Sequence, residues 1–190
     1  KNRQHATING NESKFIVRLN ENEIWLNNTI KHGYNEDFRL QNVNIYGDLT
    51  NKSTAIKISI ANLWTISKVN IWDFYIGIEI TDSYYGVFSE MCSIRRCWTG
   101  ILFSRGVDSY EVNTLDLSNI KLQGIDSNEV QSLIPKNPSE TDEDYIERAG
   151  SAGIRSYCTF NGVKFWGMTV EGFDFGFKFC RVDLPYLAAA

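Results

Sequence analysis

No apolar run in this chain approaches the ~18 residues that a membrane-spanning helix requires, so no such span is expected. The four cysteines form neither a CxxC pair nor a zinc-type spacing with histidine, and no metal or other cofactor is predicted. They are expected to be buried free thiols, and the alternative is that two of them form one disulfide. The two histidines, His5 and His32, stand among polar residues, which argues against Ser-His-Asp or Cys-His catalysis.

A basic stripe is also missing. The chain has 19 Lys and Arg against 23 Asp and Glu, a net charge of −4, so no nucleic-acid partner is expected. The chain has 190 residues, 43% of them hydrophobic, and is therefore long and apolar enough for one domain with a sizeable core. The start KNRQHATING lacks the apolar segment of a signal peptide. A start without Met and the ending LAAA are expected of a piece cut from a longer protein.

An eight-residue pattern of alternating apolar and polar or small residues recurs along the chain. It reads LQNVNIYG, ISKVNIWD, SEMCSIRR, LSNIKLQG and FWGMTVEG, beginning at Leu40, Ile66, Ser89, Leu117 and Phe165. A second apolar strand follows each repeat, and three of these strands open at the same offset, at Gly77, Gly100 and Gly176. The Leu117 repeat departs from this offset because 25 extra residues precede its partner strand at Gly153.

Short strands that return about every 23 residues predict a coil whose turns lie parallel on one another. From Leu40 to Arg181 the pattern resembles the right-handed parallel β-helix of the pectin-lyase-like superfamily. The resemblance implies an all-β fold, a right-handed single-stranded parallel β-helix of about five to six turns. Residues 1–39 would form an irregular N-terminal turn or cap, 40–181 the helix with a short α-helical insertion at 125–150, and 182–190 a tail. An ordinary β-sandwich is the alternative.

Alternation along each strand assigns side chains to an inward or an outward face. The predicted inward columns are Val43, Val69, Cys92, Ile120, Met168; Ile45, Ile71, Ile94, Leu122, Val170; and Ile56, Ile78, Ile101, Ile154, Phe177. A strand before each repeat is predicted to turn inward Trp64, Val87, Leu115 and Val163. Asn42 and Asn119 are predicted to satisfy the backbone of one corner. In the insertion, Ser139 or Thr141 is expected to cap a helix that Gly150 ends.

Candidate functional residues lie on the outward face. One outward stack is Tyr46, Trp72, Arg95, Gln123 and Glu171, beside a second of Asn44, Asn70, Ser93, Lys121 and Thr169. Just past the strand, one edge would carry Tyr75, Trp98, Asp126 and Asp174. Aromatic faces stack on sugar rings, and a carboxylate pair ~5–9 Å apart is what glycosidic cleavage needs. The predicted catalytic residues are therefore Asp126 and Asp174, with Glu171 as the substitute. The predicted substrate-binding residues are Tyr46, Trp72, Tyr75, Arg95 and Trp98. The alternative is that the carboxylates are solvated acids beside a loop.

Two activities of the superfamily do not carry over. Polygalacturonases have NTD, DD, HG and RIK motifs in order, whereas here NTLD at Asn113 breaks the first, HG at His32 is out of order and RIK is missing. Pectate lyases need a calcium-binding acid cluster, and no such cluster accompanies Arg95 and Lys121.

The remaining resemblance is to phage tailspikes and appendage proteins, which bind and often cut bacterial surface polysaccharide. It implies a polysaccharide-binding module, at the virion or the cell surface, that forms a homotrimer. Depolymerisation, as a glycoside hydrolase or a lyase, is left open. The alternative is a non-catalytic structural or assembly segment of a virion or surface fibre. The acidic charge balance favours a neutral or cationic glycan.

Overall fold

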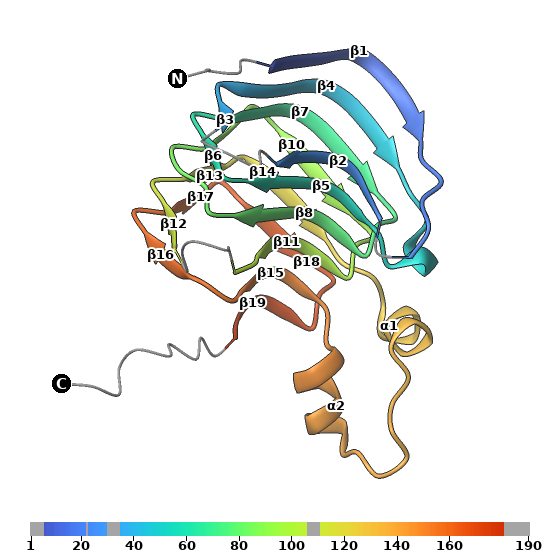
Figure 1. Cartoon of the computed structure of the whole chain (residues 1–190). Helices are drawn as coiled ribbons and strands as arrows, with labels where there is room; N and C mark the ends of the chain where they lie inside the picture. The colour runs from blue at the N-terminus through green and yellow to red at the C-terminus, as the bar shows by residue number, and fades with distance from the viewer. Residues whose placement is uncertain (1–5, 22, 30–34, 106–110, 181–190) are drawn as a thin grey trace, which may run out of the picture.

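The computed structural model describes residues 6–21, 23–29, 35–105 and 111–180. His5, His32 and the predicted tail at 182–190 lie outside these residues. Within this part of the chain, every strand pairing is parallel, which confirms the predicted stacking of one repeat on the next. The strands descend in tiers from the N-terminal to the C-terminal end, and two helices project beside the last tiers (Figure 1).

The largest sheet has nine strands and carries the eight-residue repeats. It consists of β1 (Ala6–Ile16), β4 (Phe38–Tyr46), β7 (Thr65–Trp72), β9 (Val87–Ser89), β10 (Cys92–Arg95), β13 (Asp116–Ser118), β14 (Ile120–Gln123), β17 (Lys164–Trp166) and β18 (Thr169–Glu171). Each repeat contains a residue with left-handed backbone at the same place, at Asn42, Lys68, Glu90, Asn119 or Gly167. A left-handed residue bends an extended chain sharply. The repeated bend therefore creases this sheet along one line.

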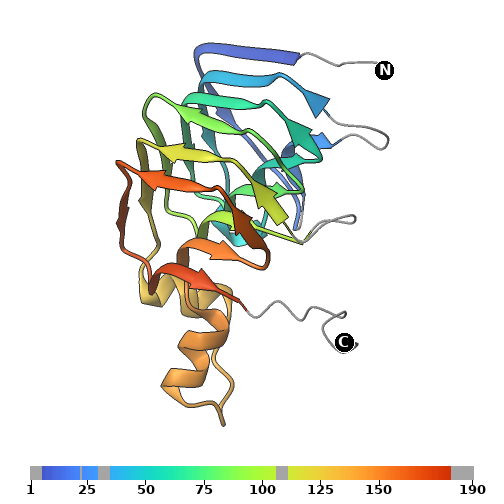
Figure 2. The ribbon, with the colours of Figure 1, turned by 90° about the vertical axis from the view of Figure 1, so that its left-hand side faces the viewer.

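The strands fall into three sets: the nine-stranded sheet, a second large sheet and two short strand pairs. One passage of the chain through the three sets is called a turn. The second sheet has six strands: β2 (Ile24–Thr29), β5 (Thr54–Ser59), β8 (Ile76–Thr81), β11 (Thr99–Phe103), β15 (Ala152–Ser156) and β19 (Phe175–Phe179). The short pairs are β3 (Asn35–Glu36) with β6 (Ala61–Asn62), and β12 (Glu111–Asn113) with β16 (Thr159–Asn161). A 3₁₀ turn, Leu49–Asn51, lies at one corner. Viewed from the side, the sets curl around a common interior (Figure 2).

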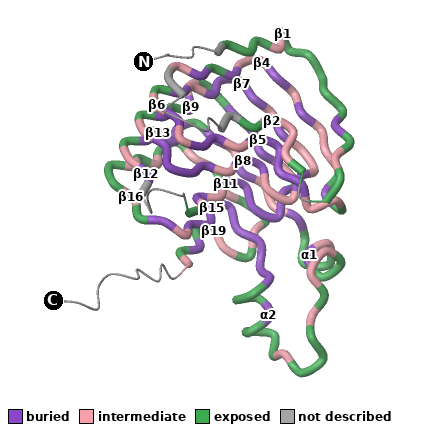
Figure 3. The backbone as a smooth tube through the Cα atoms, viewed as in Figure 1, coloured by how far each residue is buried: buried purple, intermediate pink, exposed green. Residues whose placement is uncertain are grey.

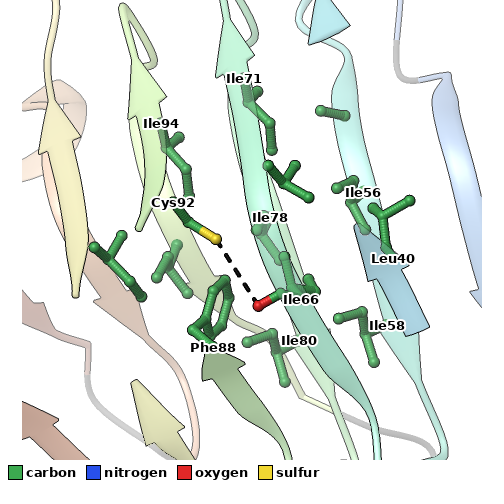
Figure 4. Packing of buried hydrophobic residues seen from close by; sticks show 14 of the residues in the cluster. Leu40, Ile56, Ile58, Ile66, Ile71, Ile78, Ile80, Phe88, Cys92 and Ile94 are labelled. Atoms are coloured by element: carbon green, nitrogen blue, oxygen red, sulfur yellow. Dashed lines mark hydrogen bonds between the residues drawn. The ribbon is translucent and has the colours of Figure 1, made fainter. Parts of the chain in front are cut away.

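The predicted inward columns are confirmed by the strand pairing. Ile45 pairs with Ile71 and Ile71 with Ile94, and each is fully buried. The column continues through Leu122 to Val170, and the Ile56 column runs unbroken to Phe177. Figure 4 shows Ile71 and Ile94 of one column and Ile56 and Ile78 of the other among the buried side chains. The Cys92 thiol lies 3.9 Å from the carbonyl oxygen of Ile66.

The prediction that Val87 points inward is wrong. Val87 is 37% exposed and pairs with the outward Thr65, while Gly86 takes the inward place below Trp64. A Cβ on Gly86 would lie 2.0 Å from Cε2 of Trp64, because the indole fills that space. Phe88 takes the next inward position, with its ring edge-to-face against Trp64 at 5.5 Å. The large indole thus compensates for the missing side chain of the glycine.

One extra residue near Glu90 accompanies this shift. Phe88 pairs with Ile66 and Ser89 with Ser67, so the predicted equivalence of Ser89 and Ile66 is wrong. Ser93 nevertheless pairs with Asn70, as predicted. The register is therefore offset before the bend and restored after it.

The N-terminal strands extend the same columns. Ile8 pairs with Leu40, Phe15 with Ile45, and Leu26 with Ile56. Strands β1 and β2 therefore add one further strand to each of the two large sheets, within the segment 1–39 that was predicted to be an irregular turn or cap.

The insertion contains two helices, α1 (Ser127–Leu133) and α2 (Asp142–Ala149). Helix α2 is the predicted one. Thr141 Oγ1 accepts a hydrogen bond from the Asp144 amide at 3.1 Å, and at the other end the Gly150 amide donates to the carbonyl oxygen of Ile146. Helix α1 was not predicted. Its start at Asp126 has direct consequences for the candidate carboxylates.

Candidate functional site

An open groove of about 410 Å³ runs along the crease of the nine-stranded sheet, on its outward face. It is lined by Glu12, Asn42, Asn44, Lys68, Asn70, Met91, Ser93, Arg95 and Lys121. Its volume is within the range of small-ligand sites, but its lining is more polar than in most of them. The groove therefore favours a ligand rich in hydrogen-bonding groups.

A ladder of four polar side chains forms the floor of this groove, one from each of four successive turns. The ladder is Asn44, Asn70, Ser93 and Lys121. The Asn70 amide donates to Oδ1 of Asn44 at 2.9 Å, and the Asn44 amide donates to the Glu12 carbonyl at 3.1 Å. These bonds fix the orientation of both amides. Because paired strands lie ~4.8 Å apart, the groove presents polar groups at regular intervals along its length.

The positively charged side chains of the groove differ in whether a carboxylate forms an ion pair with them. Lys68 Nζ lies 2.8 Å from Glu90, whose carboxylate raises the pKa of the lysine. Lys121 Nζ lies 2.8 Å from Glu171, the predicted substitute acid. Arg95 donates from Nε to Ser93 Oγ at 2.6 Å, and no carboxylate of the described residues is within ion-pair distance of it. Arg95 is therefore the cation best placed to meet a ligand oxygen.

Tyr46 and Trp72 lie on the same outward face, next to Arg95, as predicted. Their rings are stacked on each other, with centroids 4.5 Å apart and an interplanar angle of 2°. Lys14 Nζ lies 4.4 Å from the Tyr46 centroid. One face of each ring thus contacts the other ring, and neither Tyr46 nor Trp72 is among the residues that line the groove.

Tyr75 and Trp98 form a second stacked pair, 4.4 Å apart, beneath the insertion. Trp98 is only 9% exposed, and its Nε1 donates to the Ala149 carbonyl at 2.7 Å. The Arg155 guanidinium lies 4.2 Å from the Trp98 ring, and burial raises the pKa of Tyr75 to about 12. These two aromatics, predicted to bind substrate, anchor helix α2 to the coil.

The two candidate catalytic aspartates have separate structural roles. Asp126 is the N-cap of α1: its Oδ1 accepts from the amides of Asn128 and Glu129, each at 2.9 Å. Asp174 Oδ2 accepts from the amide and hydroxyl of Ser151, at 2.7 and 2.9 Å.

The aspartates also line different hollows. Asp126 borders a hollow of about 250 Å³ with Leu49 and Glu129, whereas Asp174 borders one of about 260 Å³ with Tyr145. The structure does not bring the two carboxylates together around one hollow, and each is held by donors that stabilise the corner of the insertion.

Four lining residues were not among the predicted candidates: Glu12, Lys68, Met91, and Asn42, which was predicted to have a structural role at a corner. Lys68 stands at the left-handed bend of its repeat, and Met91 follows the bend at Glu90. The signal that could have found them is the position of the bend, since a crease in a sheet gathers the side chains on either side of it.

Among the residues that the structure describes, no group of acidic, histidine or cysteine side chains is arranged to hold a metal ion. No helix in this part of the chain is long and apolar enough to cross a membrane. No protein-family model, no curated protein and no solved structure matches the chain.

Proposed function

We propose that the chain is a carbohydrate-recognising module, and that the groove binds a bacterial cell-surface polysaccharide as part of a phage tailspike-like protein. We propose equally that the fold is a right-handed single-stranded parallel β-helix. Parallel pairing of every turn with its neighbours supports the fold. The polar ladder, with Arg95 beside its third member Ser93, supports the function.

The chemistry of the ladder suits a sugar polymer. Sugar hydroxyls both donate and accept hydrogen bonds, and amide, hydroxyl and guanidinium groups are their natural partners. The amides of Asn44 and Asn70 are held in place before the ligand arrives, so little ordering cost remains at binding. Repetition of the ladder from turn to turn matches a ligand whose own units repeat.

Binding without cleavage is the form of this proposal that the geometry favours. Asp126 and Asp174 are held in different hollows, and Glu171 is paired with Lys121 at 2.8 Å. A glycosidase needs an acid and a second carboxylate on opposite sides of one bond. Hydrolase or lyase activity would have to come from a different arrangement.

The experiment is a calorimetric titration of the chain with bacterial capsular polysaccharides and teichoic acids. A charge-assisted hydrogen bond contributes about 1.5–3 kcal/mol, so Arg95→Ala should weaken binding roughly 10- to 100-fold. Arg39→Ala is the matched control, because Arg39 is an exposed arginine of the same sheet that does not line the groove. Equal affinities of the two variants for the polysaccharide would exclude the groove as the binding site. Release of oligosaccharide during the titration would show that the chain cleaves its ligand.

A structural role in a virion or surface fibre is the second candidate. The observation that favours it is the exposure of apolar side chains at both ends of the column, including Phe15 and Phe177. The resemblance to tailspikes further implies a homotrimer. Sedimentation of the chain, with and without the polysaccharides above, separates a lateral trimer from a monomer.

A further inference from the structure

Arg95 occupies a position in the groove at which no carboxylate faces it from either neighbouring strand. Past its bend at Lys68, strand β7 alternates between buried and partly buried residues (Figure 3). Arg95 belongs to the same outward row and is the only residue of β10 that is not buried. Its partners on the two neighbouring strands are Trp72 and Gln123. Neither partner carries a charge, so neither compensates the guanidinium across the strands.

The carboxylates around the groove gather instead at its two lysines. The ion pair with Glu90 at 2.8 Å, and more weakly the charge of Glu12, raise the pKa of Lys68. Glu171 forms an ion pair with Lys121 at 2.8 Å. The groove therefore has no general positive charge. Its third cation comes from β10, the strand between those of the two lysines, and has no carboxylate of the described residues within ion-pair distance.

The guanidinium of Arg95 is held from one side. Its Nε donates to Ser93 Oγ at 2.6 Å, and within the described residues it makes no other hydrogen bond. The bond at Nε restrains the plane of the group, while the two terminal nitrogens carry four further N–H donors. Two of these can donate in parallel to two oxygens of one carboxylate or phosphate. A sugar hydroxyl, with its single oxygen, cannot accept both bonds in this geometry.

We infer that the groove selects polysaccharides that carry an acidic unit, whose carboxylate or phosphate oxygens bind Arg95. This rests on the proposed function, since it names the class of polysaccharide that the groove takes. Neutral units beside the acidic one would meet Asn70 and Asn44, which lie one and two turns from Ser93 along the ladder.

The net charge of −4 bears on this choice only at long range. Salt largely screens exposed charges that are more than about 8 Å apart at physiological ionic strength. A ligand oxyanion in contact with Arg95 is well inside that distance. The local charge of the groove therefore decides between an acidic and a neutral glycan.

The experiment compares two forms of one ligand by calorimetric titration. The first is a bacterial capsular polysaccharide that contains a hexuronic acid, and the second is the same polymer after its carboxyl groups have been reduced to primary alcohols. The wild-type chain should bind the acidic form roughly 5- to 30-fold more tightly, because a charge-assisted hydrogen bond replaces a neutral one. A poly(glycerol phosphate) teichoic acid is the third ligand and tests phosphate as the source of the anion.

Arg95→Gln removes the charge and retains a hydrogen-bond donor, so it should bind the two forms of the capsule equally and lose affinity for the teichoic acid. Arg39→Gln is the matched control, because Arg39 is an exposed arginine of the same sheet that does not line the groove, and it should keep the wild-type preference. Circular dichroism should show both variants folded.

The outcomes separate this inference from the proposed function. A preference for the unreduced capsule that Arg95→Gln abolishes assigns a carboxylate to Arg95, and binding of teichoic acid that the same variant abolishes assigns a phosphate. Equal binding of both capsule forms by the wild type, with no binding of teichoic acid, would overturn the acidic unit while leaving glycan recognition in place. So would a preference that survives in Arg95→Gln. No binding of any of the three polymers would overturn the proposed function and this inference together.

Discussion

The core column makes a quantitative prediction for Ile94→Ala. Ile94 is fully buried between Ile71 and Leu122, and its Cγ2 would lie 2.4 Å from a Cβ on Gly77, so the side chain fills the space over that glycine. The substitution removes three carbon atoms, which at ~0.8 kcal/mol each amounts to about 2.4 kcal/mol. The unfilled cavity adds to this, and we expect a loss of about 3–4 kcal/mol in the free energy of unfolding.

Urea denaturation, monitored by tryptophan fluorescence, measures this loss as a shift of the denaturation midpoint when the m-value is unchanged. For a chain of this size it corresponds to a fall in Tm of about 6–16 °C. Gln123→Ala is the control: Gln123 is in the adjacent turn and on the outward face, and the change should cost no more than about 0.5 kcal/mol. A loss of unfolding free energy below 1 kcal/mol for Ile94→Ala, or equal losses for both variants, would refute the packing described for this column.

Three further perturbations test other parts of the structure. Gly86→Ala should cost about 1–3 kcal/mol through its clash with Trp64, and Trp64→Leu in the same chain should remove most of that added cost in a double-mutant cycle. Asp126→Ala should lower stability by ~1 kcal/mol through loss of the α1 cap while leaving glycan affinity unchanged; a large loss of binding would contradict its structural role. Arg148 lowers the pKa of Glu140 to about 2, so the ion pair stabilises the fold above the ordinary carboxyl pKa and is lost as pH falls toward 2. Glu140→Gln should flatten that part of an acid-unfolding curve, and an unchanged curve would argue against the pair.

The columns were predictable because a strand has a strict period of two. Once the repeats are aligned, the positions of Ile45, Ile71 and Ile94 follow from the register alone, and the pairing confirms them. Val87 was mispredicted because alternation does not reveal an extra residue at a bend. That residue became visible only through the pairing of Ser89 with Ser67.

The candidate site was harder to predict, because exposure depends on contacts distant in sequence. Trp98 has the pattern of an outward aromatic, but its indole is covered by Ala149, 51 residues later. Asp126 has the pattern of a free acid, but α1 begins beside it and uses its carboxylate as a cap. The groove itself arises from left-handed residues such as Lys68, whose backbone conformation no composition rule for lysine would suggest.

The most direct test of the proposed groove is to follow side-chain amide and arginine resonances by NMR while a binding polysaccharide is added. Asn44, Asn70 and Arg95 should shift together and saturate at one common concentration. The indole resonance of Trp98 should stay in place, because that ring is buried beneath α2. Shifts at Trp98 with none at the ladder would contradict the account and move the site to the insertion.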